Sequence, residues 1–279
     1  MLKELIKQVF KSKAARDRES LALARDLIQI SDLSHAMQVI DGLVATSPDC
    51  GPAWRLRARL NQRMGKVTEA GADLARAALL TPDDAESQFE IAASYLELGN
   101  TSEALKHCKT ARQLAPDDTR VFAMLARISL PGDFYFDVLG RIIEFLKPKT
   151  YVEIGIFRGE SLKLARAASA VVGIDPQPQI DWAPEPHIRI FATTSDAFFA
   201  NHDLRKELGG RPVDLAFIDG LHQFEFALRD FANLERNCKP ASTILVHDCY
   251  SVDEISADRE PRSVSWSGDV WRLIVLLKK

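Results

Sequence analysis

The sequence lacks several features that would point to particular classes of protein. No apolar run approaches the roughly 18 residues that a membrane-spanning helix needs. The four cysteines, Cys50, Cys108, Cys238 and Cys249, lie far apart without the CxxC spacing of a zinc site or the pattern of a disulfide framework. The formal net charge is only −3, from 36 Lys and Arg against 39 Asp and Glu, so no excess of positive charge favours nucleic acid. These absences predict a cytoplasmic protein without a nucleic-acid partner.

The first residues are amphipathic. Between Met1 and Arg16, five Lys or Arg interrupt five apolar residues, which predicts an amphipathic helix rather than a signal peptide. Its basic face could meet an acidic membrane, but a solvated face beside a packed one is the commoner arrangement. We therefore expect no membrane partner.

Two domains are expected from the length and from a change of pattern along the chain. The 279 residues, 46% of them hydrophobic, exceed one average domain and can bury two cores. The Pro-Gly-Asp sequence at 131–133 interrupts the helical periodicity of the first half, and from Lys149 short apolar runs alternate with helical stretches. We place the domains at 1–130 and 131–279.

The first half contains an internal repeat of 34 residues. Pro48, Pro82 and Pro116 have this spacing, and each is followed by Asp. Two columns of alanine and one of small turn residues share it: Ala24, Ala58 and Ala92; Ala36, Ala70 and Ala104; Ser31, Gly65 and Gly99. The pattern resembles the tetratricopeptide repeat (TPR) family. This resemblance implies three helix pairs and a capping helix, at 17–50, 51–84, 85–118 and 119–128.

The character of the repeat columns favours the same all-α array. Alanine lets antiparallel helices approach closely, the Gly/Ser column permits the turn between them, and proline ends each unit. Such arrays present a concave helix surface to a partner. Arg55, Arg59 and Arg63 recur on one helix at i, i+4 and i+8, where like charges repel unless an acidic group relieves them. An acidic peptide or the chain's own second domain would do so; the alternative is a solvated cationic stripe.

The second half predicts a parallel sheet covered by helices. Five apolar runs are expected to form buried strands, at 151–155, 170–175, 188–192, 213–219 and 242–248. Helical stretches alternate with them, at 161–169, 196–208 and 224–238. This order is typical of a doubly wound, Rossmann-like α/β fold, in which ligands lie beyond the carboxyl ends of the strands.

Glycines and polar residues gather at these predicted strand ends. Gly155 and Gly159 permit a tight turn that brings the backbone close to a ligand, and the helix that begins near Ser161 presents free N–H groups to the cleft. Asp175 follows Gly155 by 20 residues, where a carboxylate can accept both hydroxyls of a ribose. The layout predicts a nucleoside site. The Gly-x-Gly-x-x-Gly fingerprint is absent, which argues against NAD.

Four features carry a second resemblance: Glu153 before the first glycine, Asp175, the sequence Phe-Ile-Asp-Gly-Leu-His at 217–222 and His-Asp at 247–248. Together they resemble the class I S-adenosylmethionine-dependent methyltransferases, over about 149–279. The resemblance implies that Glu153 faces the methionine portion of the cofactor and Asp175 its ribose. The implied cofactor-binding residues are Glu153, Gly155, Gly159, Ser161, Asp175, Ser195 and Asp196. The last two would face adenine, or cap a helix and bind nothing.

Asp219, His222, His247 and Asp248 form a second group, since the fourth and fifth strands are neighbours in this fold. In metal-using sugar O-methyltransferases of this kind, an Asp after the fourth strand and an acidic pair after the fifth hold Mg²⁺, and a His three residues beyond that Asp takes the substrate's proton. The resemblance thus implies Asp219 and His222 as catalytic residues, and Asp219, His247 and Asp248 as metal ligands. His247 departs from the acidic pair, and imidazole is a poor ligand for Mg²⁺, so metal binding stays open. The alternative for His222 is a structural histidine that caps the turn.

Methyltransferases of this class normally continue beyond the last helix into two further strands, whereas this sequence stops at Lys279. We expect an incomplete sheet of five strands with apolar residues 244–246 on an exposed edge. The segment 251–267 has no apolar periodicity and is expected to form a lid or acceptor loop.

Two functions are compatible with these patterns. The first is an S-adenosylmethionine-dependent methyltransferase that acts on an oxygen of a small molecule or sugar and is targeted by its repeats. The second is a TPR interaction protein whose methyltransferase-like half is inactive. Within enzymes, an iron-dependent hydroxylase is the alternative, since relatives with the Asp-Gly-x-His signature carry that label.

Overall fold

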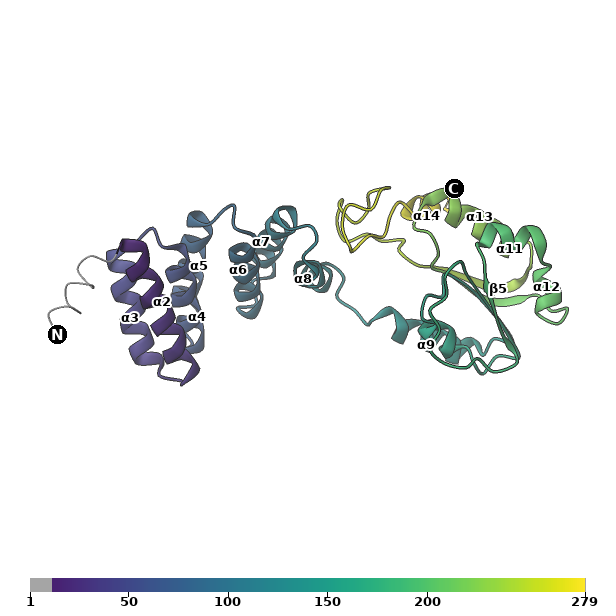
Figure 1. The fold of residues 1–279 in the computed structure, drawn as a ribbon, viewed down its shortest axis with the longest axis horizontal. Helices are drawn as coiled ribbons and strands as arrows, with labels where there is room; N and C mark the ends of the chain where they lie inside the picture. Colours follow the sequence, from purple (N-terminus) through teal and green to yellow (C-terminus); the bar gives the residue numbers. More distant parts are fainter. Residues whose placement is uncertain (1–11, 279) are drawn as a thin grey trace. The chain divides into compact units, whose positions relative to one another are not determined.

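The chain forms two compact units, Met1–Ser129 and Leu130–Lys279, shown in Figure 1. The computed structural model describes residues 12–278, so most of the amphipathic segment predicted at 1–16 lies outside the described residues. No helix within the described range is long and apolar enough to cross a membrane.

The first unit is a row of helical hairpins (Figure 1). Its helices are α2 (Lys13–Gln29), α3 (Leu33–Thr46), α4 (Gly51–Arg63), α5 (Val67–Leu80), α6 (Ala85–Glu97), α7 (Thr101–Leu114) and α8 (Thr119–Ser129). The pairs α2–α3, α4–α5 and α6–α7 are followed by the single helix α8. The predicted array of three helix pairs and a capping helix is therefore confirmed.

The repeated small residues explain this packing. All six alanines of the two repeat columns are at most 1% exposed, because each lies where two helices come closest. The turn column has a positive φ at every position: 63° at Ser31, 75° at Gly65 and 76° at Gly99. Glycine adopts this left-handed conformation without strain. The 34-residue period thus determines both the helix interfaces and the turns.

The second unit is built on a five-stranded parallel sheet with the order β3-β2-β1-β4-β5. Its strands are β1 (Thr150–Ile154), β2 (Ala170–Asp175), β3 (Ile188–Ala192), β4 (Val213–Ile218) and β5 (Cys238–Val246). Its helices are α9 (Tyr135–Leu146), α10 (Glu160–Leu164), α11 (Ser195–Asn201), α12 (Leu204–Glu207), α13 (Phe224–Glu235) and α14 (Trp271–Leu277). The Rossmann-like sheet is confirmed. The predicted helix 161–169 is shorter than expected, and the helix predicted at 196–208 is divided into α11 and α12.

Helices cover both faces of this sheet. On one face α9 and α10 pack against the strands, where Leu162 meets Tyr151. On the other face α11, α12 and α13 do so, where Phe198 meets Val152. Since successive strand residues point to opposite faces, both faces are apolar, and polar groups gather at the edge where the strands end.

β5 lies at one side of the sheet, and five strands are present among the residues described. Residues 244–246 lie on this edge strand, as expected, but they are half-buried. The reason is that Ile244 and Val246 pack on the α11–α13 face, and Leu245 packs on the α9 face.

Candidate active site

A cavity of about 810 Å³ lies at the carboxyl ends of the strands, a size typical of sites for small molecules and cofactors. Nine of the eleven site residues predicted from the sequence line it: Gly155, Ser161, Asp175, Ser195, Asp196, Asp219, His222, His247 and Asp248. Glu153 and Gly159 are not in its wall. The strand ends thus bring together residues up to 93 positions apart, from 155 to 248.

The turn after β1 requires glycine. Gly155 has a φ of 83°, and a Cβ there would lie 1.9 Å from the carbonyl oxygen of Asp219. No side chain fits, so the β1 and β4 loops approach more closely than any other residue would allow. Gly159 also has a positive φ, and a Cβ there would meet the side chains of Ile180 and Trp182 rather than a ligand.

Asp175 fixes the loop that follows β1. Its Oδ2 accepts hydrogen bonds from the backbone N–H of Ile156 and Phe157, at 3.0 and 2.9 Å, and its Oδ1 accepts one from Gln177 at 2.7 Å. A carboxylate has about four acceptor positions, so three backbone donors leave one for a ligand in the cavity, rather than the two that both hydroxyls of a ribose would need.

Glu153 lies behind the cavity wall and is fully buried. Its carboxyl group contacts the hydroxyls of Tyr151, at 2.8 Å, and of Ser161. Burial raises the pKa of Glu153 to about 8, although the hydrogen bonds from Ser161 and Tyr151 act in the opposite direction. Ser161 is the member of this group that lines the cavity, so Glu153 reaches the site only through it.

The start of α11 forms another part of the wall. The cap of this helix is Thr194, whose hydroxyl accepts from the backbone N–H of Ala197 at 3.2 Å, so neither Ser195 nor Asp196 is the cap. Both carboxylate oxygens of Asp196 accept from Arg229, at 2.9 and 2.8 Å. The carboxylate of Asp196 is thus engaged within the protein.

The structure brings Asp219, His222, His247 and Asp248 together. His222 Nε2 lies 3.1 Å from Asp248 Oδ2 and 3.6 Å from Asp219 Oδ1. His247 Nδ1 lies 3.1 Å from Asp219 Oδ1 and 3.2 Å from Asp248 Oδ2. Neither contact of Nδ1 has hydrogen-bond geometry, so we treat them as ion pairs. Two carboxylates therefore face two imidazoles at the ends of β4 and β5.

These contacts shift the pKa values of Asp219 and His247. Burial alone would raise the pKa of Asp219, but the adjacent imidazole rings of His222 and His247 lower it to about 2. Burial alone would lower the pKa of His247, but Asp219 and Asp248 together raise it to about 10. The ring of Tyr135 lies against His247, with centroids 4.4 Å apart. His247 is accordingly an imidazolium at neutral pH.

His222 is held by the loop before α14. Its Nδ1 lies 2.9 Å from the carbonyl oxygen of Trp266, which makes Nδ1 the donor and leaves the lone pair of a neutral ring on Nε2. Gly268 presses against the same residue: a Cβ there would lie 1.6 Å from the His222 carbonyl oxygen. The segment 251–267 has no helix or strand, as predicted, and it orients this histidine.

Asp219, His247 and Asp248 were the implied metal ligands, and they offer ligand atoms within 4.8 Å of one another. The donor set does not fit the Mg²⁺ that the resemblance implied. Mg²⁺ prefers oxygen ligands, whereas one of the three donors is the imidazole of His247, a poor ligand for this ion.

The wall also contains residues that were not found from the sequence, among them Tyr135, Phe157, Phe226 and Asp230. The aromatic residues belong to α9, to the turn after β1 and to α13, where the sequence carries no site signature. Asp230 had a detectable signal, since with Ala227 and Leu234 it occupies the buried face of α13. An acid on the apolar face of a helix is unusual and marks a position to examine.

The repeat unit has a groove of its own, about 760 Å³ in volume and lined by residues of α2, α4, α6 and α8. Five arginines and three glutamates line it: Arg25, Arg55, Arg59, Arg63, Arg120, Glu86, Glu90 and Glu97. The wall therefore has an excess of two positive charges.

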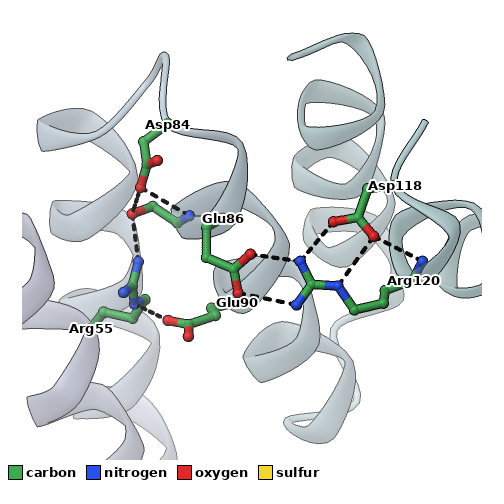
Figure 2. Close-up of polar contacts among 7 residues, drawn as sticks. Arg55, Asp84, Glu86, Glu90, Asp118 and Arg120 are labelled. Carbon is green, nitrogen blue, oxygen red and sulfur yellow. Dashed lines mark hydrogen bonds and ion pairs between the residues drawn. The ribbon is translucent and has the colours of Figure 1, made fainter. Parts of the chain in front are cut away.

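Some of these charges pair within the groove (Figure 2). Arg55 forms an ion pair with Glu90, and Arg120 lies 2.7 Å from Glu86 and 2.6 Å from Asp118. In the predicted cationic stripe, the charge of Arg55 is thus neutralised by a glutamate of the repeat unit itself. Arg25, Arg59 and Arg63 are exposed and have no acidic partner among the residues that the structure describes.

Solved structures and family models match parts of this chain. No curated protein matches it. Similar solved structures include the Yersinia enterocolitica chaperone SycD in complex with a peptide of the translocator YopD, at 21% identity over 43% of this chain and 95% of that one, with a TM-score of 0.37. PcrH from Pseudomonas aeruginosa has 20% identity over 42% of this chain and 94% of that one, with a TM-score of 0.37.

Two family models match. Residues 63–128 match the tetratricopeptide repeat, and residues 152–249 match a methyltransferase domain. The second range contains every predicted site residue. The chain therefore carries tetratricopeptide repeats followed by a methyltransferase domain.

Proposed function

We propose that the sheet unit is a class I S-adenosylmethionine-dependent methyltransferase that methylates an oxygen of a small molecule or sugar. The observation that carries this proposal is the single cavity in which Gly155 and Asp175 meet Asp219 and His222. One side of it suits a nucleoside, and the other side suits a hydroxyl acceptor.

The nucleoside side fits the cofactor in size and in chemistry. The cavity of about 810 Å³ lies within the size range of small-molecule and cofactor sites, the turn at Gly155 permits close approach, and Asp175 keeps one acceptor position for a ribose hydroxyl. In this proposal Glu153 does not touch the cofactor. It holds Ser161 in place through their hydrogen bond. When bound, S-adenosylmethionine supplies an electrophilic methyl group on a sulfonium and leaves as a neutral thioether.

His222 is the proposed general base. Its Nε2 takes the proton of the acceptor hydroxyl as the oxygen bonds to the methyl carbon. The carboxylates of Asp219 and Asp248 then stabilise the imidazolium, because both lie within 3.6 Å of Nε2. In-line alignment of the acceptor oxygen with the methyl group supplies much of the remaining rate.

The groove of the repeat unit is proposed to bind an acidic peptide. Arg25, Arg59 and Arg63 carry the argument, since they are exposed cations without acidic partners in the described part of the chain, and the groove has excess positive charge. An acidic segment would relieve the repulsion between Arg59 and Arg63, which are one helical turn apart.

Calorimetric titration with S-adenosylmethionine tests the enzyme proposal. We expect saturable binding that Asp175→Ala weakens at least 100-fold, because the variant loses the ribose acceptor and the contacts that hold the β1 loop. The matched control is Asp181→Ala, an exposed aspartate outside the cavity. No heat with the wild type would favour the alternative, an interaction protein with an inactive domain. Labelled methyl donor added with a cell extract then identifies the acceptor.

A further inference from the structure

The charges in the groove of the repeat unit are sorted by helix. All three glutamates of its wall, Glu86, Glu90 and Glu97, lie on α6, and each contacts a side chain of α4 or α8. Figure 2 shows two of these contacts, Glu90 with Arg55 and Glu86 with Arg120. The α6 side of the groove thus carries carboxylates that already have partners within the repeat unit.

The cations without such partners lie on α2 and α4. Arg25 belongs to α2, and Arg59 and Arg63 belong to α4. All three are exposed, and no acidic residue in the described part of the chain pairs with them. The carboxylates of a partner are therefore attracted to the α2–α4 side of the groove and repelled by the glutamates of α6. This charge complementarity gives a bound acidic segment a preferred side.

The spacing of the two free arginines on α4 limits how the acids of a partner can be arranged. Arg59 and Arg63 are four residues apart on one helix, so a rise of about 1.5 Å per residue places them about 6 Å apart along its axis. In an extended peptide every second side chain points to the same side, with a repeat of about 6.6–6.8 Å. Acids at alternate positions therefore match the two arginines, whereas consecutive acids point to opposite sides.

A helical partner with acids four residues apart would match the same spacing, but the groove wall does not suit a helix. Peptide helices dock in grooves through an apolar stripe. Eight of the sixteen residues that line this groove are Arg or Glu, so a docked helix would leave its apolar stripe against charged side chains. An extended segment needs no continuous apolar surface, and the wall favours it.

We infer that the groove binds an extended segment in which acidic residues occupy alternate positions, and that their carboxylates face Arg59 and Arg63. The inference rests on the proposed acidic-peptide function of the groove and names the arrangement of acids that it selects. A guanidinium can bind a carboxylate through two parallel hydrogen bonds, so each arginine takes one acid of the series. Arg25 adds a further cation on the same side. The intervening side chains point away from α4 and are free to vary.

The test compares three fluorescein-labelled nonapeptides of identical composition, three glutamates and six alanines, with amidated C-termini. Their glutamates lie at alternate positions, at consecutive positions, or four residues apart. Fluorescence anisotropy with the full chain should show that the alternating peptide binds about two- to fivefold more tightly than either of the others, because each of those loses one exposed ion pair.

Arg63→Ala should make the alternating and consecutive peptides bind equally, since one arginine cannot read a spacing. Arg76→Ala is the matched control, an exposed arginine of α5 outside the groove, and it should keep the wild-type preference. A preference that survives in Arg63→Ala would overturn the inference.

The other outcomes separate the inference from the function on which it rests. Equal binding of all three peptides by the wild type would overturn the inference and leave an acidic-peptide groove that reads net charge only. Tightest binding of the peptide with glutamates four residues apart would overturn it in favour of a helical partner. If the wild type binds none of the peptides, the proposed function of the groove fails and the inference fails with it.

Discussion

The two units of the chain differ in where their charged side chains lie. In the groove of the repeat unit, charged side chains lie at the surface, where Arg120 pairs with Glu86 and Arg63 has no acidic partner among the residues described. In the methyltransferase unit, acids are buried, among them Glu153 on β1 and Asp230 on α13. Burial raises the pKa of Glu153 to about 8 and that of Asp230 to about 6.

This difference indicates that the charged groups have different roles in the two units. Exposed ion pairs contribute only about 0.2–1 kcal/mol each and are screened by salt, so the groove can exchange its internal pairs for pairs with a partner at little cost. Buried ionisable groups are strongly coupled to their surroundings. Changes at the strand ends should therefore have large effects, and changes in the groove should have small ones.

The largest effect is expected for His222→Gln. The rate of methyl transfer should fall by about 10²- to 10⁴-fold, because the base is lost while the glutamine amide can still donate to the Trp266 carbonyl. Binding of S-adenosylhomocysteine, measured by calorimetry, should change less than twofold. His187→Gln, outside the cavity, is the control and should keep full activity. An active His222→Gln enzyme would show that this histidine only caps the turn.

The second prediction concerns Glu153→Gln and pH. The pKa of Glu153 is about 8 in the folded chain, against 4.5 for a free side chain. The folded state thus binds the proton more tightly, and the corresponding stability is complete below about pH 4.5 and is lost as the pH rises through 8. The loss amounts to at most about 5 kcal/mol. The glutamine side chain of the variant does not titrate. Relative to that of the wild type, the unfolding free energy of the variant should therefore rise as the pH increases from about 4.5 to 8.

Urea unfolding at pH 5, 6.5 and 8 measures this difference. Glu160→Gln serves as the control, since Glu160 is exposed and pairs with Lys163 at 2.8 Å; its curve should stay parallel to that of the wild type. Parallel curves for Glu153→Gln as well would mean that Glu153 is ionised in the folded protein, and the contrast between the two units would then weaken.

The third prediction compares glycines in the two units. Gly268 has a φ of 63°, and a Cβ there would collide with the His222 carbonyl oxygen, so Gly268→Ala should destabilise the methyltransferase unit by about 2–4 kcal/mol. Gly65 has a φ of 75° with open space around it. Gly65→Ala should cost only the backbone term of about 1 kcal/mol, and Ser31 at the same repeat position already carries a side chain. Equal losses in urea unfolding would contradict this account.

Most of the fold was predictable because its signals are periodic. The 34-residue spacing locates the helices of the repeat unit, and the apolar runs locate all five strands, since buried parallel strands read as continuous apolar sequence. The helix ends were less predictable. The helix predicted at 196–208 is divided because Asp203 starts a new helix, its side chain accepting from the backbone N–H groups of Arg205 and Lys206.

The site was predictable where residues follow strands, and not where helices supply them. Asp175, Asp219 and Asp248 are strand-end residues, and all three line the cavity. Tyr135 and Asp230 reach the cavity from α9 and α13, through packing that is not visible in a linear pattern. The sequence also does not show which carboxylates pair with a neighbour inside the protein. Asp196 was therefore a candidate cofactor-binding residue, although its carboxylate pairs with Arg229.

The smallest effect is expected in the groove. Arg63→Glu should weaken binding of a fluorescein-labelled octaglutamate peptide by about two- to fivefold, as one exposed ion pair is worth about 0.2–1 kcal/mol. Fluorescence anisotropy measures this, and the effect should disappear in 0.5 M NaCl because salt screens exposed charges. Stability should change by less than about 0.5 kcal/mol. Arg76→Glu, also exposed but outside the groove, is the control. An equal loss in both variants would mean that the peptide follows net charge alone, and no binding by the wild type would remove the acidic-peptide proposal.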